Sequence, residues 1–226
     1  MSPFESSEAT DASTVPGGGP AGGREPQPVG IVLAGGASRR FGRDKAALSV
    51  VRGGAVETLA ERALRRLAEV CGEVAVADAG RGVVPRARSL ADGPGRGPAA
   101  GLLGAARAFP ARSLLVLACD LPAVPAALLA RLAEVGGGGG VDLALPRWRE
   151  GAEPLAAFYG EKALVALQRR VAAGNYALYD LADDPGLRVA FLSEVDLLPF
   201  GLPEEIFANV NTPEDLALWL ARSESG

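Results

Sequence analysis

The chain has 226 residues, of which 48% are hydrophobic and 22% charged, enough for one domain with a sizeable buried core. Its formal net charge of −4 argues against general nucleic-acid binding, which depends on Lys and Arg neutralising phosphates. Histidine is absent and only two cysteines occur, which excludes His-based catalysis, zinc cages and a disulfide framework. Chemistry here must rest on carboxylates, Lys and Arg, backbone amides and a hard cation.

The N-terminal residues 1–28 are rich in Ser, Glu, Gly and Pro and show almost no apolar periodicity, so we expect a disordered tail. They lack the basic start and apolar stretch of a secretory signal, and no run of about 18 apolar residues occurs in the chain. With two thiols that suit a reducing compartment, these features predict a cytoplasmic protein. Residues 29–226 are expected to form a single domain, with no segment in a membrane.

Beyond the tail, apolar strand-like runs alternate with segments of helical periodicity. In chain order we expect strand Val29–Ala34, helix Glu57–Val70, strand Glu73–Ala77, helix Pro98–Phe109, strand Ser113–Ala118, helix Pro125–Val135, a flexible connection Gly136–Gly140, strands Val141–Leu145 and Leu155–Tyr159, helices Glu161–Ala173 and Tyr176–Ala182, strand Leu187–Leu192 and helix Thr212–Ala221. This alternation predicts an α/β fold with a mainly parallel central sheet covered on both faces. Ligands of such sheets bind beyond the carboxyl ends of the strands.

The loop Leu33–Lys45, with the sequence LAGGASRRFGRDK, follows the first predicted strand. Gly35 and Gly36 allow a sharp turn and a close approach of backbone amides to an anion. Four cations lie within seven residues of this loop: Arg39, Arg40, Arg43 and Lys45. The loop matches neither the dinucleotide pattern G-x-G-x-x-G nor a P-loop ending in G-K-[ST]. These residues alone fit an anion-binding turn and a solvated basic turn equally well.

Asp120 directly follows the predicted strand Ser113–Ala118, so its carboxylate should lie at the carboxyl edge of the sheet. Mg²⁺ is commonly bound by one or two carboxylates together with substrate phosphate oxygens. A second interpretation is an Asp that caps the turn before Pro122. Both interpretations fit the residues taken alone, and the neighbouring basic loop favours the metal.

Two further sets of polar residues have structural and functional interpretations. Asp92 lies in a Gly/Pro-rich loop, where Asp is a common turn residue. Asn209 and Asn211 precede a helix that Thr212 can cap, and capping explains part of this motif. The two amides also fit contacts with a ligand or with the water shell of a metal.

The loop resembles the L-A-G-G-x-[SA]-x-R-M-G-x-D-K signature of the molybdenum cofactor guanylyltransferases, with Phe41 in place of Met. Four later segments resemble family motifs in the same order: Asp92 with the downstream Gly97–Gly101, the C-D-x-P-x-x-P match Cys119–Pro125, Glu153–Leu155 with Tyr159, and the N-V-N-T-P-E-D-L match Asn209–Leu216. The resemblance implies a Rossmann-like three-layer nucleotidyltransferase fold. It also implies transfer of GMP from GTP to molybdenum-bound molybdopterin, with release of pyrophosphate and with Mg²⁺ as cofactor.

The resemblance assigns roles to residues of this chain. The residues that it implies for nucleotide binding are Leu33, Ala34, Gly35, Gly36, Lys45, Asp92 and Asp120. Those that it implies for catalysis are Arg40, Lys45 and Asp120, with Asp120 as the Mg²⁺ ligand, and Asn209 and Asn211 meet the second substrate or the metal shell. The implied partners are GTP and a molybdopterin-type cofactor, with molybdoenzymes or cofactor-delivery proteins downstream.

One departure from the family pattern concerns the loop after the second predicted strand. The family has an Asn that contacts the nucleotide there, whereas this chain has Ala79 beside Asp78. The base preference is therefore open. The alternatives are a related transferase that uses CTP or another acceptor, such as a sugar phosphate, and a non-catalytic nucleotide-binding regulator.

Overall fold

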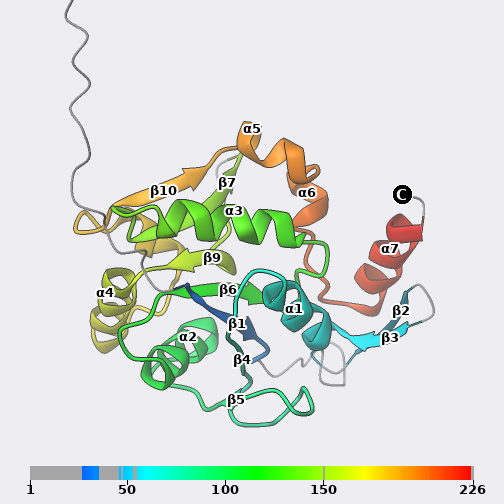
Figure 1. Ribbon diagram of the computed structural model, residues 1–226, viewed down its shortest axis with the longest axis horizontal. Helices are drawn as coiled ribbons and strands as arrows, with labels where there is room; N and C mark the ends of the chain where they lie inside the picture. The colour runs from blue at the N-terminus through cyan, green and yellow to red at the C-terminus, as the bar shows by residue number, and fades with distance from the viewer. Residues whose placement is uncertain (1–26, 36–45, 47, 53–54, 150, 225–226) are drawn as a thin grey trace, which may run out of the picture.

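The computed structural model describes residues 27–35, 46, 48–52, 55–149 and 151–224. Over these residues, eight strands form one mixed sheet in the order β10-β7-β9-β6-β1-β4-β5, with β8 paired to β7 (Figure 1). The strands are β1 (Val29–Leu33), β4 (Val74–Ala77), β5 (Ser89–Leu90), β6 (Leu114–Ala118), β7 (Leu143–Trp148), β8 (Gly151–Ala152), β9 (Ala156–Tyr159) and β10 (Val189–Leu192). A separate antiparallel hairpin consists of β2 (Ser49–Arg52) and β3 (Ala55–Thr58).

Helices cover both faces of the sheet. The longer helices are α1 (Leu59–Ala68), α2 (Gly97–Ala108), α3 (Ala126–Gly137), α4 (Glu161–Ala172) and α7 (Pro213–Glu224). Shorter segments are the 3₁₀ turns η2 (Tyr179–Asp183) and η3 (Leu198–Phe200) and the helices α5 (Glu194–Leu197) and α6 (Pro203–Ile206). Helices α1 and α3 pack together on one face, and α2 and α4 pack together on the other (Figure 1). In the described part of the chain, no helix has the length and apolarity needed to cross a bilayer.

Most neighbouring strands run parallel, as the sequence pattern predicts. β1 pairs in parallel with β4 on one side and with β6 on the other, and the pairs β4–β5 and β7–β10 are also parallel. β9 is reversed and lies antiparallel between β6 and β7, while the short β8 is antiparallel to β7. The prediction of an α/β fold with a mainly parallel central sheet is therefore confirmed.

The central strands and helix α1 form where local sequence signals are strongest. All five residues of β1 and all five of β6 are buried, because a strand covered on both faces has no solvent side. Helix α1 begins with a capping box, in which Glu61 N–H donates to Thr58 Oγ1 at 3.1 Å and Thr58 N–H donates to Glu61 Oε2 at 2.7 Å. This cap starts the helix at Leu59, two residues later than the predicted Glu57.

Two predicted segments differ from the structure in the type of element and not only in their bounds. The expected flexible connection Gly136–Gly140 is wrong for its first two residues, which belong to α3. A Cβ on Gly136 would overlap the Phe158 ring, so glycine allows α3 to pack directly on β9. The expected helix Tyr176–Ala182 is instead a 3₁₀ turn over Tyr179–Asp183.

The predicted tail, residues 1–28, lies outside the described residues apart from Gln27 and Pro28. Arg112 donates from Nη2 to the Gln27 carbonyl at 2.8 Å, which ties the start of the described chain to the segment before β6. The single domain over residues 29–226 remains a prediction.

Candidate active site

The ends of three parallel strands meet at one edge of the sheet. Leu33, at the end of β1, lies opposite Ala77 of β4 and Ala118 of β6. Two backbone hydrogen bonds continue this pairing beyond the strands: Ala34 N–H donates to Ala77 O at 3.0 Å, and Cys119 N–H donates to Leu33 O at 3.1 Å. The loops after β1, β4 and β6 therefore leave the sheet side by side, as expected for strands that run parallel.

The start of the basic loop lies at this edge. Leu33 and Ala34 are buried, and Gly35 is exposed. A Cβ on Gly35 would meet only Ala77 O within 4 Å, at an ordinary contact distance of 3.8 Å, so crowding by the described protein does not require glycine there. The remaining predicted residues of this loop lie outside the described residues: Gly36, Arg40 and Lys45, with Arg39 and Arg43.

Asp120 follows β6 at the same edge and is half-buried. Its carbonyl accepts a 2.9 Å hydrogen bond from Val210 N–H, which brings the segment Asn209–Asn211 to the end of β6. Val210 is buried, whereas Asn209 and Asn211 on either side of it are exposed. The structure thus places both asparagines next to Asp120, although α7 and β6 are distant in sequence.

The start of α7 holds Asn211 in place. Thr212 Oγ1 accepts from Asp215 N–H at 3.1 Å, and Asp215 Oδ2 accepts from Thr212 N–H at 2.8 Å. The same carboxylate oxygen accepts from Asn211 N–H at 2.9 Å. The predicted cap by Thr212 is confirmed, and it fixes the main chain of Asn211 while leaving its side chain exposed.

Asp92 lies in the connection between β5 and α2. A Cβ on Gly101 of α2 would stand 3.2 Å from Leu33 Cδ2 and 4.0 Å from Asp92 Oδ1, which places the Asp92 carboxyl over α2, near the end of β1. Partial burial raises the pKa of Asp92; the positive charge of Arg81 lowers it and the negative charge of Asp78 raises it. Asp92 therefore lies within electrostatic reach of the loop after β4.

Asp78 organises that loop from the inside. It is fully buried, and its carboxylate accepts hydrogen bonds from Gly80 N–H at 3.1 Å, from Val83 N–H at 2.8 Å and from the Ser89 hydroxyl. Buried carboxylates require such partners, because an unpartnered charge in the interior is costly. The buried carboxylate of Asp78 therefore has a structural role, which is to hold its own loop in place.

Arg81 and Ala79 complete this loop, and no sequence motif singled out Arg81. Arg81 donates from Nε to Asp78 O at 2.8 Å and from Nη2 to the carbonyl of Ala34, so it joins the loop after β4 to the end of β1. Ala79 has a φ of 59°, in the left-handed region that Asn adopts more readily than Ala. The backbone at Ala79 thus suits the Asn that the resemblance expects there.

Glu153, which the sequence motifs include without a site role, is a second carboxyl near Asp120. It is 9% exposed. Burial is the main cause that raises its pKa to about 7. The Leu155 N–H, which donates to Glu153 Oε1 at 2.9 Å, opposes this rise, and the charge of Asp120 contributes to it. Leu155 O in turn accepts from Ala118 N–H at 2.8 Å, which joins the Glu153 segment to the end of β6. Within the described ranges, no three His, Cys, Asp or Glu side chains gather as a metal site.

Comparisons with known proteins show the family of this chain. The family model of the MobA-like NTP transferase domain matches residues 30–188. A protein of Opitutus terrae named "Probable molybdenum cofactor guanylyltransferase" is 40% identical over 200 residues, which are 83% of this chain and 92% of that protein. A protein of the same name from Pelotomaculum thermopropionicum is 35% identical over 198 residues, 84% of this chain and 90% of that protein.

A solved structure supports the same conclusion for the fold. The crystal structure of molybdopterin-guanine dinucleotide biosynthesis protein A from Archaeoglobus fulgidus has a TM-score of 0.72 to this chain and 27% sequence identity. The match covers 88% of this chain and 100% of that one. The nucleotidyltransferase fold implied by the sequence motifs is confirmed, and the chain belongs to the family of the MobA-like NTP transferase domain.

Proposed function

We propose that this chain is a molybdenum cofactor guanylyltransferase, which transfers GMP from GTP to molybdenum-bound molybdopterin and releases pyrophosphate. The observation that carries the proposal is the convergence of Asp120, Asp92 and the segment Asn209–Asn211 on the edge where the basic loop begins. Relatives with that name, at 35% and 40% identity over most of the chain, support the choice of GTP and a molybdopterin-type acceptor. Its product would pass to molybdoenzymes or cofactor-delivery proteins.

In this proposal, the basic loop holds the triphosphate. Backbone amides of Gly35 and Gly36 approach the phosphates, and Arg40 and Lys45 neutralise their charge. Leu33 and Ala34 contribute mainly apolar contact, because their backbone carbonyls and the Ala34 N–H already join the strand ends. Asp92, which lies near Leu33, contacts the nucleotide.

The donor set at the end of β6 fits Mg²⁺. Asp120 and Glu153 are close enough for the charge of Asp120 to raise the pKa of Glu153, so a cation between the two would relieve their repulsion. Mg²⁺ commonly takes one or two carboxylates plus phosphate oxygens, and when bound it would neutralise charge on the triphosphate. We assign Asp120 as its ligand, with Asn209 and Asn211 toward its water shell or the second substrate.

The reaction needs no general base from the protein. The terminal phosphate of molybdopterin is a monoester with a second pKa of about 6, so the attacking oxygen is largely deprotonated at neutral pH. This oxygen forms a bond to the α-phosphorus of GTP, while the bond to the bridging oxygen breaks and pyrophosphate leaves. Positioning and charge neutralisation then account for the acceleration, in agreement with a chain that has no histidine.

Ala79 is the observation that favours a second candidate. It stands where the family has a nucleotide-contacting Asn, so a related transferase that uses CTP, or another acceptor such as a sugar phosphate, is the alternative. A non-catalytic nucleotide-binding regulator would be expected to lose the metal carboxylate, and Asp120 is present.

Thermal-shift measurements with GTP, CTP, ATP and UTP, each with Mg²⁺, test the base assignment. A ligand that binds only the folded state raises its stability by about 2.7 kcal/mol at a concentration of 100 Kd. We expect GTP alone to give a large shift. A larger shift with CTP would overturn the base assignment, and no shift with any nucleotide would overturn nucleotide transfer as the function.

A further inference from the structure

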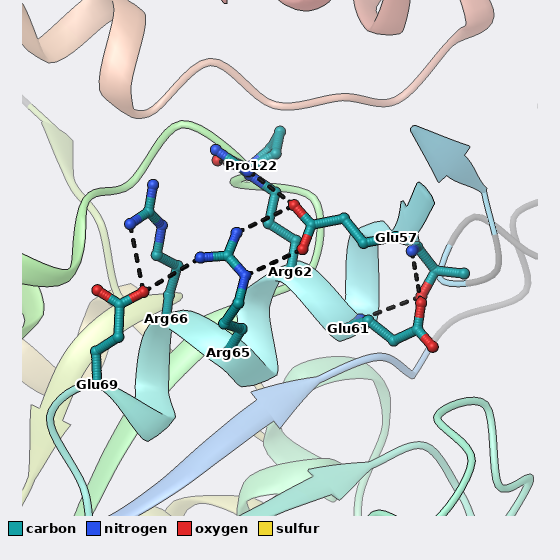
Figure 2. Close-up of polar contacts among 8 residues, drawn as sticks. Glu57, Glu61, Arg62, Arg65, Arg66, Glu69 and Pro122 are labelled. Atoms are coloured by element: carbon teal, nitrogen blue, oxygen red, sulfur yellow. Dashed lines mark hydrogen bonds and ion pairs between the residues drawn. The ribbon is translucent and has the colours of Figure 1, made fainter. Parts of the chain in front are cut away.

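Arg62 of α1 points into the protein toward the loop after β6 and is only 3% exposed. Its Nε donates to the carbonyl of Pro122 at 2.8 Å, and its Nη1 donates to Glu57 Oε1 at 2.9 Å (Figure 2). The centre of the guanidinium lies 5.0 Å from the centroid of the Trp219 ring in α7. One buried side chain therefore contacts three separate elements: β3, the loop after β6, and α7.

Two of these contacts involve segments that are linked to Asp120. Pro122 lies two residues after Asp120, and the Asp120 carbonyl accepts from Val210 N–H at 2.9 Å. The segment that contains Val210 leads into α7, whose Trp219 packs against Arg62. Arg62 is therefore linked to this region in two ways. It bonds Pro122 in the loop that contains Asp120, and it packs on α7, which follows the segment that bonds the Asp120 carbonyl.

We propose that Arg62 is a positioning residue that fixes the Asp120 loop and the Asn209–Asn211 segment relative to each other for cation binding. This inference rests on the proposed role of Asp120 as the Mg²⁺ ligand. Stability does not require a charge at such a position, because apolar side chains of similar volume often replace buried ion pairs without loss. A guanidinium does offer several donors in a rigid plane, so one group can hold a carbonyl and a carboxylate at once, and lysine does not share this geometry.

Arg65, one helical turn further along α1, provides a matched control. It also binds Glu57, through Nη2 to Oε1 at 3.1 Å and Nε to Oε2 at 3.1 Å, and it reaches Glu69 at 3.2 Å. Its side chain is 48% exposed and points along the surface of α1 (Figure 2). Partial burial raises the pKa of Glu57, but hydrogen bonds from Arg65 and Arg62 lower it overall. The two arginines thus share one carboxylate, and Figure 2 shows Arg62 also bonded to the carbonyl of Pro122.

The test measures Mn²⁺ binding in the presence of GTP, by electron paramagnetic resonance, for the full chain and the variants Arg62→Lys and Arg65→Ala. Loss of a group that orients a metal ligand costs about 10- to 100-fold in metal affinity. We expect Arg62→Lys to weaken Mn²⁺ binding by about tenfold or more and Arg65→Ala by less than about twofold. GTP binding without divalent metal should be unchanged in Arg62→Lys, whereas a general loosening of the fold would weaken it.

Each outcome decides between the two proposals. If the parent chain binds no Mn²⁺ with GTP, the proposed function fails, and the role of Arg62 fails with it. If the parent binds Mn²⁺ and Arg62→Lys binds it equally well, only the role of Arg62 is overturned. If Arg62→Lys does not fold, Glu57→Gln replaces it, because it removes the carboxylate that orients Arg62; unchanged Mn²⁺ affinity in that variant would also overturn the inference.

Discussion

The backbone N–H of Val210 donates a 2.9 Å hydrogen bond to the carbonyl of Asp120, so main chain ties the C-terminal segment to the end of β6. Replacing the Asp120 carboxyl group leaves this bond in place. We predict that Asp120→Asn folds normally but reduces turnover of GTP by about 100-fold or more, since a neutral amide is a poor cation ligand.

Pyrophosphate release at saturating GTP and Mg²⁺ measures this effect, with the melting temperature of the variant as the control for folding. Turnover within about tenfold of the parent would remove Asp120 from the proposed machinery, because a metal-binding carboxylate is expected to contribute more than that.

Lys45 tests the assignment of the basic loop. A hydrogen bond to a charged group contributes about 1.5–3 kcal/mol, so Lys45→Ala should weaken binding of GTP by about 10- to 100-fold in isothermal titration. Arg39→Ala is the matched control, because Arg39 occupies a variable position of the family signature in the same loop. Equal losses in both variants would mean that the loop acts only through its net charge.

The buried Glu153 carboxyl predicts a pH dependence of stability. Its pKa is raised to about 7, mainly by burial; the Leu155 hydrogen bond opposes this rise and the charge of Asp120 contributes to it. This folded-state pKa exceeds the unfolded value of about 4.3. The stabilisation from protonated Glu153 is therefore fully present below the unfolded pKa and is lost as the pH rises through about 7.

We predict that Glu153→Gln, which is uncharged at every pH, gains stability relative to the parent by about 2–3 kcal/mol between about pH 5 and pH 8. Urea denaturation in metal-free buffer measures the difference, since a bound cation would stabilise the ionised carboxyl. Parallel pH profiles for parent and variant would show that Glu153 does not titrate in this range.

Ala79, with its φ of 59°, permits a paired experiment on strain and on base recognition. The left-handed conformation costs a residue with a Cβ about 1–2 kcal/mol, and glycine avoids this cost. The greater entropy of glycine in the unfolded state reduces the gain by about 0.4–1 kcal/mol. We expect Ala79→Gly to raise the free energy of unfolding by about 0.5–1 kcal/mol in chemical denaturation.

Ala79→Asn adds an amide at the same backbone position. If this loop reads the base, Ala79→Asn should strengthen GTP binding relative to CTP binding, while Ala79→Gly should leave that ratio unchanged. If the ratio of GTP affinity to CTP affinity is the same in the parent and in both variants, this position does not take part in base recognition.

Much of the sheet was predictable because its signals are local. The apolar runs of β1 and β6 reflect strands without a solvent side, and the rule for parallel strands placed Asp120 at their carboxyl edge. The hairpin β2–β3 and the reversed direction of β9 were not predicted, since short segments carry no local signal for the partner with which they pair. Gly136 was misread as part of a linker, because its close contact with Phe158 comes from another element.

The motifs of this chain therefore identified its family, its α/β class and the position of Asp120 at the end of β6 without coordinates, because each depends on residues that are near one another in sequence or on a general rule for parallel sheets. The contacts of Arg62 with Pro122, of Arg81 with Ala34 and of Val210 with Asp120 became visible only in three dimensions. They join segments that are far apart along the chain, so their geometry follows from how helices and loops pack on the sheet, and local patterns do not encode that packing.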